Sequence, residues 1–413
     1  MRLTPEEEGM LRGEKGAAVE EALRVQLRVG GFFEAEGFVP VKNVHMMGDI
    51  EVMGDGGLEF LRHMAGIGAR CVVNTTTNAR CFDFDYIERL NQDKEAAEKE
   101  KELISLLQEI GAMTTDTCIN YQFLYQPHPG EHVAWGDTGT VIYANSVLGA
   151  RSNFESGPVA LAAALTGRTP AYGFHLDERR KGKILVELEA KPKNLADWGA
   201  VGKIVGERHQ NYFSVPVFAG VEGSPTADDL KHLGTSLASY GSMGMFHMAG
   251  VTPEAETGED AFGSQEPEET VTVTDRDLDE LYASYDTGDG EANLIVFSGP
   301  QLSLYELKTI SELLEGKKIK EGTSLIITTN RGYKAAGERL GYLRKIEEAG
   351  GIVLEGVCFY ILDSVARMRV ENGWNNLVTN SAKLANIIGA HRYNPILRRT
   401  EECVDAALTG RIE

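Results

Sequence analysis

The stretch ANLIVFSGPQLSLYELKTISELLEGKKIKEGTSLIITTN, residues 292–330, decides the fold class of this chain. Its apolar runs at 292–299 and 323–330 enclose a helical segment around 305–314, and a third run, GGIVLEGVC (350–358), follows after another helical segment. Continuous apolar runs of this length are typical of strands that a parallel sheet buries on both faces. The alternation of such strands with helices predicts a doubly wound α/β domain.

Upstream of this stretch the chain keeps the same alternation. Residues 183–189 alternate apolar and polar side chains like a half-buried strand, and 92–110 is strongly helical. Residues 71–73 are predicted as a short buried strand, with the polar run 74–78 at its carboxyl end. Open α/β sheets bind ligands at that edge, so the polar run is a candidate part of a site.

The domain boundaries follow from length and composition. A chain of 413 residues exceeds the usual size of one core, so two or three domains are expected. Residues 253–270 hold many acids and one large apolar side chain. Such a segment buries too little apolar surface to offset the conformational entropy that it would lose on ordering. We therefore predict an N-terminal α/β region of two domains (1–252), a solvated acidic linker (253–275) and a C-terminal doubly wound domain (276–413).

The overall composition limits the partners and the compartment. A formal net charge of −21 opposes binding to nucleic acid, whose phosphates need clustered Lys and Arg. No apolar run is long enough to cross a membrane and the first residues are acidic, so we expect no membrane partner and a cytoplasmic location. An odd number of widely spaced cysteines argues against a disulfide framework: Cys71, Cys81, Cys118, Cys358 and Cys403.

A second stretch, residues 118–175, carries the candidate chemistry. It places glycines, small hydroxyls, amides and histidines between short apolar runs, as a concave site requires when backbone approaches a ligand and fixed donors such as Asn145 orient it. Arg151 and Arg168 lie among small uncharged residues. Such arginines suit recognition of a carboxylate, and a surface salt bridge is an equal alternative. The stretch is interpreted as the floor of an active site.

Three histidines and one helix start have two interpretations each. His45, His132 and His175 are candidate acid–base groups because imidazole titrates near neutral pH, although a histidine beside aromatic residues is more often structural. The polar run 379–383 opens a helix. It either binds an anion, with Lys383 adding a charge, or is an ordinary capped helix start.

Cys118 and Cys358 both follow predicted strands, in different domains. If the domains pack with their strand ends together, the two thiols face one crevice and could hold iron or an iron–sulfur cluster. The alternative is that each is a small buried hydrophobic residue, because free cysteine is among the most buried residue types. No CxxC pair decides between these interpretations.

A run of motifs in a fixed order along the chain resembles the large subunit of the aconitase X family. The motifs cover nearly the whole chain: GDGGLEFL (54–61), NTTTNA (74–79), the TCxxY ending at Tyr121, GEHVAW (130–135), YANSVLGARSN (143–153), ALTGRTPAYGFHLDE (164–178), GMFHMAGVTPEA (244–255) and TNSAK (379–383). The resemblance implies an aconitase-like fold, with several α/β domains of mostly parallel sheets around a central cleft. It also implies a small swivelling domain as a partner subunit.

The resemblance further implies a hydro-lyase with an iron–sulfur cluster that dehydrates a small hydroxy carboxylic acid, either cis-3-hydroxy-L-proline or mevalonate 5-phosphate. On this hypothesis His132, His45 and Ser381 are catalytic and Cys118 and Cys358 bind the metal. The remaining site residues would bind the substrate carboxylate or phosphate: Thr75, Thr76, Asn145, Arg151, Asn153, Arg168, His175 and Lys383.

One departure from the family pattern concerns the cluster. The family's third cysteine falls in a motif whose counterpart here is SGPQLS (298–303), where Gly299 occupies the cysteine position. A cluster with three cysteine ligands is therefore in question, and the cluster could be smaller, differently ligated or absent. This departure favours cis-3-hydroxy-L-proline as the substrate. The alternatives are a cluster-free relative that catalyses another carbanion or cyclisation reaction, and a non-catalytic binding subunit.

Overall fold

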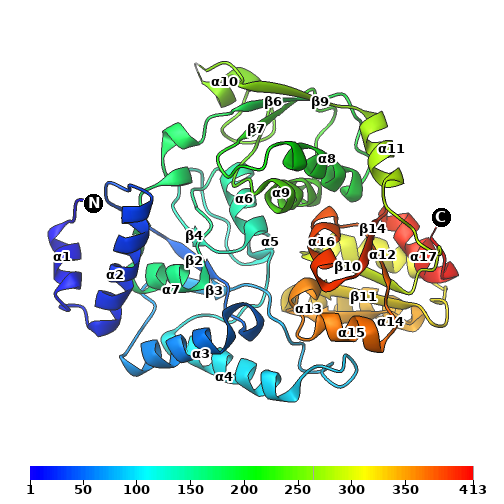
Figure 1. The fold of residues 1–413 in the computed structure, drawn as a ribbon, viewed down its shortest axis with the longest axis horizontal. Coiled ribbons are helices and arrows are strands. Elements are labelled where there is room, and N and C mark those ends of the chain that lie inside the picture. Colours follow the sequence, from blue (N-terminus) through cyan, green and yellow to red (C-terminus); the bar gives the residue numbers. More distant parts are fainter. Residues whose placement is uncertain (264, 413) are drawn as a thin grey trace.

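The computed structural model describes residues 1–263 and 265–412. Three parallel sheets organise the described residues, and Figure 1 shows them as three units around the middle of the molecule, where the short helix α5 (Asn120–Phe123) lies. This arrangement confirms the predicted α/β class.

The first sheet has the strand order β3-β2-β4, and its helices pack mainly on one face. Alternation along β2 turns Val44 and Met46 toward these helices and His45 toward the opposite face. The elements of this region are α1 (Pro5–Leu11), α2 (Ala17–Phe32), β1 (Phe38–Pro40), β2 (Asn43–Met46), α3 (Ile50–Gly66), β3 (Asn74–Thr77), α4 (Lys94–Ile110), α5, β4 (Ala134–Trp135), α6 (Thr138–Ser146), α7 (Gly157–Thr166) and β5 (Arg168–Pro170).

The second sheet has the order β8-β7-β6-β9, and the adjacent helices α8 and α9 connect it to the centre of the molecule (Figure 1). Its elements are β6 (Ile184–Leu188), α8 (Leu195–Arg208), β7 (Pro216–Ala219), α9 (Ala227–Gly241), β8 (His247–Met248), α10 (Gly258–Phe262), β9 (Glu269–Val273) and α11 (Asp275–Ala283). Two short 3-10 turns precede it, η1 (Gly173–His175) and η2 (Asp177–Arg179).

The third sheet has the order β12-β11-β10-β13-β14 and is buried on both faces, by α12, α14 and α17 on one side and by α15 and α16 on the other. It contains the three strands predicted from the apolar runs. Its elements are β10 (Leu294–Leu302), α12 (Leu304–Leu314), β11 (Ser324–Thr329), α13 (Arg331–Arg339), α14 (Tyr342–Ala349), β12 (Ile352–Glu355), η3 (Phe359–Ile361), α15 (Val365–Glu371), β13 (Asn376–Thr379), α16 (Ala382–Ile387), η4 (Ile388–His391), β14 (Asn394–Leu397) and α17 (Thr400–Thr409).

Two local predictions are wrong. The acidic segment 253–275 is not a solvated linker, because β9 pairs in register with β6 and buries Val271 and Val273. Two alternating valines are enough to attach a short edge strand. The strand predicted at 71–73 lies instead at Asn74–Thr77, because threonine is as good a strand former as valine and the threonines pair with the buried β2.

Asp49 is a buried carboxyl that makes the first domain sensitive to pH. Its Oδ1 accepts the N–H of Val52 (3.1 Å) at the start of α3, while Oδ2 has no hydrogen-bond partner. Burial, followed by the charge of Glu100, raises the pKa of Asp49 to about 7. A carboxyl whose pKa is higher in the folded protein stabilises the fold at low pH. That contribution is lost as the pH rises from the unfolded value of 3.8 through 7.

Replacing this carboxyl by an amide is expected to stabilise the protein in alkaline solution. Asp49→Asn keeps the cap on α3 but cannot ionise. The gain in free energy of unfolding over wild type should grow between pH 4 and pH 8 and reach on the order of 2 kcal/mol. Thermal unfolding at several pH values measures it. Asp93→Asn, which alters the exposed cap of α4, is the matched control and should show no gain at pH 8.

Candidate active site

The carboxyl ends of the first and third sheets face each other and form the candidate site. The chain after β3 is joined to the chain after β12, where the N–H of Arg80 donates to Gly356 O (2.9 Å). At the end of β10, the Gln301 amide donates to the carbonyls of Asp116 and Val357 (both 3.1 Å). Ligands bind at this edge in open α/β sheets, and here two such edges are apposed.

This apposition brings Cys118 and Cys358 from separate domains into one buried cluster. The Cys118 sulfur accepts the N–H of Gln301 (3.2 Å), and the Cys358 sulfur lies 4.0 Å from Ser298 Oγ. Burial raises the pKa of both thiols, and the charge of Asp137 adds to this effect while that of Lys383 opposes it. Both are therefore protonated at neutral pH unless a cation replaces the protons.

Lys383 supplies the positive charge of this cluster. Its Nζ lies 3.7 Å from Asp137 Oδ1 and donates to Thr138 Oγ1 (3.3 Å). Burial opposes its charge, but Asp137 and then the two thiols more than compensate and raise the pKa of Lys383. A charged ammonium thus lies between the first and third domains, near the thiols.

His45 contributes an imidazole whose free nitrogen is buried. Its Nδ1 is 2.8 Å from Thr76 Oγ1, and that hydroxyl also lies 3.3 Å from Val44 O, to which it donates. The single hydroxyl proton can serve one acceptor, so Nδ1 carries the ring proton and Nε2 keeps a lone pair. Nε2 makes no hydrogen bond, and burial lowers the pKa of His45 to about 4, although Asp137, Asn78 and the Thr117 backbone act in the opposite direction. His45 is therefore neutral and able to accept a proton.

Other polar atoms around the same cleft are buried without partners. They include the Oδ1 of Asn78, which neighbours His45, both amide atoms of Asn120, and the hydroxyl of Tyr121. Leaving such atoms unpaired costs roughly 1–3 kcal/mol each. Burial raises the pKa of Tyr121 well above its usual value, so the phenol is a proton donor. Unpaired buried donors and acceptors of this kind are what a polar ligand would satisfy.

The residues present do not fit a cluster with three cysteine ligands. Gly299, which holds the third family position, has no side chain and a φ of 62°. In the part of the chain that the structure describes, no group of three or more His, Cys, Asp and Glu side chains is arranged to hold a metal ion. Cys118 and Cys358 are thus two candidate thiol ligands, and the described residues place no third metal-ligating side chain with them.

His132, Arg151 and His175 form a second cluster. The Nδ1 atoms of the two histidines are 2.9 Å apart, and Arg151 donates to the carbonyl of His175 (3.0 Å) and pairs with Asp177. Burial and then the arginines lower the pKa of His132, whereas burial, then the His132 ring and then the arginines lower the pKa of His175. The structure does not join these three residues to the thiols.

The remaining predicted residues make structural contacts. The Asn145 amide bridges Ser152 O and Gly244 O, and Asn153 holds the chain at 172–174. Arg168 pairs with the carboxylates of Glu6 and Glu7 on α1.

The side chains of Thr75 and Ser381 also make hydrogen bonds within the protein. The Thr75 hydroxyl donates to Val73 O (3.0 Å). Ser381 caps α16 by accepting the N–H of Leu384 (3.1 Å), and its hydroxyl donates to the carbonyl of Gly299. Ser381 thus links α16, which carries Lys383, to the bend in β10.

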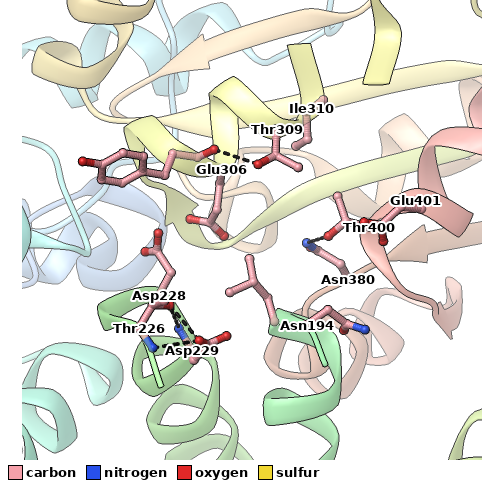
Figure 2. Close-up of a pocket in the computed structure, with 12 residues that line it drawn as sticks. Asn194, Thr226, Asp228, Asp229, Glu306, Thr309, Ile310, Asn380, Thr400 and Glu401 are labelled. Atoms are coloured by element: carbon pink, nitrogen blue, oxygen red, sulfur yellow. Dashed lines mark hydrogen bonds between the residues drawn. The ribbon is translucent and has the colours of Figure 1, made fainter. Parts of the chain in front are cut away.

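A separate pocket of about 270 Å³ lies between α9 and α12, and Figure 2 shows Asp228 and Glu306 projecting into it from these helices. Its acids are already neutralised. The ammonium of Lys231, which is fully buried, lies 3.0 Å from Asp228 Oδ1 and also pairs with Glu306, and Ser303 Oγ donates to Asp228. These contacts join the second domain to the third.

Comparison with known proteins identifies the family. Models of the first, second and third domains of aconitase X match residues 1–178, 182–283 and 292–409. The chain belongs to the aconitase X family. A crystal structure of aconitase X from Thermococcus kodakaraensis in its holo form superposes with a TM-score of 0.88 at 34% identity, over 98% of this chain and 100% of that one. The aconitase-like fold expected from the motifs is confirmed.

Two curated members of the aconitase X family are dehydratases. The phosphomevalonate dehydratase large subunit of Thermococcus kodakarensis is 36% identical over 93% of this chain and 94% of that protein. The cis-3-hydroxy-L-proline dehydratase of Pseudomonas aeruginosa is 30% identical over 99% of this chain and 70% of that protein. Dehydratases are hydro-lyases, so the predicted enzyme class, a lyase, is confirmed.

No helix within residues 1–263 and 265–412 has the length and apolar character needed to span a membrane.

Sequence reasoning missed part of this aconitase X site. Asp137 and Gln301 were not singled out, and Asn78 appeared only as the end of the polar run 74–78, although each lies within two residues of the end of a strand of the site. The useful signal was position: a polar residue one or two places after a parallel strand lies at the edge where ligands bind. Asp137 in the run Gly136-Asp137-Thr138-Gly139 also has the pattern of a helix N-cap.

Proposed function

We propose that this chain is the large subunit of an enzyme that dehydrates a small hydroxy carboxylic acid, with cis-3-hydroxy-L-proline as the preferred substrate. The observation that carries the proposal is that an ammonium, Lys383, and a buried imidazole, His45, both lie near the carboxylate of Asp137. Dehydration beside a carboxylate needs both groups, one to hold the carboxylate and one to remove the neighbouring proton.

In this proposal the carboxylate binds the Lys383 ammonium and His45 Nε2 removes the proton from the adjacent carbon. The charge of a bound carboxylate raises the pKa of His45, which makes the imidazole a stronger base in the complex. The hydroxyl leaves as water by taking a proton from a Brønsted acid, and the unpaired Tyr121 phenol is the candidate. Thr76 keeps the His45 ring in the required tautomer.

The charge of the site favours cis-3-hydroxy-L-proline. Lys383 is balanced by Asp137, so the described ammonium beside the thiols suits one carboxylate better than a carboxylate together with a phosphate dianion. Mevalonate 5-phosphate is the second candidate, because the relatives named phosphomevalonate dehydratase large subunit from Thermococcus kodakarensis and Methanosarcina mazei are 36% and 34% identical. These names also support a small subunit, the predicted swivelling domain, as the partner.

The cofactor and the compartment stay predictions. An iron–sulfur cluster at Cys118 and Cys358 would have these two thiols as ligands. Its remaining ligands would be groups other than a third cysteine. Iron and sulfide analysis of anaerobically purified protein, with its visible absorption spectrum, measures whether a cluster is present. A cytoplasmic location is tested by fractionation of the source cells.

The substrate assignment is tested with the chain purified together with its small subunit. Both acids are supplied to iron-reconstituted complex without oxygen, and loss of water is followed by mass spectrometry. We expect kcat/KM for cis-3-hydroxy-L-proline to exceed that for mevalonate 5-phosphate by at least a factor of about 100. This is the loss of affinity that one mismatched charge pair causes. The reverse order would assign the second candidate, and dehydration of neither acid would contradict both.

A further inference from the structure

Asp137 uses its two carboxylate oxygens for two different purposes. Oδ2 accepts the N–H groups of Gly139 (2.8 Å) and Thr140 (3.2 Å) and so caps α6. Oδ1 lies 3.7 Å from the ammonium of Lys383 on α16. The side chain is 11% exposed, so its charge is poorly screened by water. One carboxylate thus fixes the start of a helix in the first domain and faces a cation of the third.

The described polar contacts of the Lys383 ammonium are all with the start of α6. Its ammonium reaches Asp137 and Thr138 Oγ1, which are the N-cap and the first residue of α6. A lysine side chain has four rotatable carbons and loses considerable rotamer entropy when it is held in place. Without these contacts nothing described in the third domain would keep the ammonium beside the thiols.

The start of α6 is itself firmly positioned. Residues 139–146 of the helix are buried, and Tyr143 stacks on Tyr121 with ring centroids 4.0 Å apart. The helix also packs against α9 of the second domain. Packing within the first two domains therefore fixes the position of this N-cap. Lys383, which belongs to the third domain, is held in place by contact with it.

We propose that Asp137 is a positioning residue that clamps the Lys383 ammonium in the cleft and acts on the substrate through it. The proposal rests on the proposed role of Lys383 as the carboxylate-binding group. The ammonium has three donors, so it can keep Asp137 and Thr138 while it receives a substrate carboxylate. A pre-positioned ammonium binds the carboxylate without a further entropy cost, which lowers KM.

Capping and clamping can be separated by one substitution. Asparagine caps helices as well as aspartate, so Asp137→Asn keeps the bonds to Gly139 and Thr140 and removes the charge, which faces Lys383 and also raises the pKa of His45. Asp93→Asn changes the N-cap of α4 in the same way, at an exposed position with no lysine of the site beside it. It is the matched control for both measurements.

The first measurement is a double-mutant cycle on the complex with its small subunit, using cis-3-hydroxy-L-proline and mevalonate 5-phosphate. Asp137→Asn should raise KM about tenfold with a smaller change in kcat, and Lys383→Met should raise KM about 100-fold. Because Asp137 acts through Lys383, the double variant should be no worse than Lys383→Met alone. Multiplied losses in the double variant, or a wild-type KM in Asp137→Asn, would overturn the clamp.

The second measurement does not depend on activity. Acetic anhydride labels lysine amines, and peptide mass spectrometry follows the rate at Lys383. Asp137→Asn should label Lys383 several-fold faster than wild type, because the ammonium is both released and less strongly held in its charged form, while Asp93→Asn should not. Equal rates in all three proteins would reject the clamp even if neither acid is dehydrated. Faster labelling without any dehydration would retain the clamp and reject the proposed function.

Discussion

Lys231→Met is expected to lower the free energy of unfolding by about 3–5 kcal/mol, the usual cost of breaking a buried ion pair by removing one partner. Lys231 is 1% exposed and lies between the carboxylates of Asp228 and Glu306. Methionine fills a similar volume but leaves both carboxylates buried without their cation. Because Asp228 belongs to α9 and Glu306 to α12, the second and third domains should lose their attachment. Thermal and urea unfolding of the whole chain measure the loss.

Two further variants show whether the unpaired charge is the cause. Lys94→Met removes an exposed lysine that pairs with Glu88 and should leave the unfolding temperature unchanged. Adding Glu306→Gln to Lys231→Met should recover part of the stability, because glutamine keeps the capping box at Ser303 and carries no charge. A loss of less than about 1 kcal/mol in Lys231→Met would contradict the network.

His45→Gln is expected to lower kcat of the complex by about 10²–10⁴-fold with little change in KM, which is the range for removal of a general base. Glutamine can still accept a hydrogen bond from a ligand but cannot take up a proton. The unpartnered Nε2 and the proton held on Nδ1 by Thr76 are the reasons for this expectation. Steady-state kinetics with cis-3-hydroxy-L-proline measure both constants.

The pH profile provides a second check on this role. The pKa of His45 is lowered to about 4, so the imidazole is unprotonated above that pH and kcat/KM should fall as the pH drops through it. His63→Gln, at an exposed histidine that pairs with Glu21, should leave the kinetics unchanged. Retention of more than a tenth of wild-type kcat by His45→Gln would assign the base to another group.

The sequence by itself determined the elements of the third domain and picked out the two thiols of the site. Runs such as LIVF at 294–297 are apolar in every position, so a sheet buried on both faces was the consistent solution. Both cysteines were predicted to lie at strand ends and to meet if the domains packed edge to edge. Cys358 does follow an apolar strand, whereas Cys118 follows the polar run 114–117, which forms no strand. Their proximity is confirmed, while their role as metal ligands stays a prediction.

Only the tertiary structure decided which polar residues share a cleft. Arg168 and Asn145 have the same local setting in sequence as a ligand-binding residue, but chain packing supplies Arg168 with the acids of α1 and Asn145 with two carbonyls. Asp137 is locally an ordinary helix cap, and Lys383, 246 positions further on, gives it a second function. Local pattern fixes which groups a segment offers, whereas long-range packing fixes which partners neutralise those groups and which remain free for a substrate.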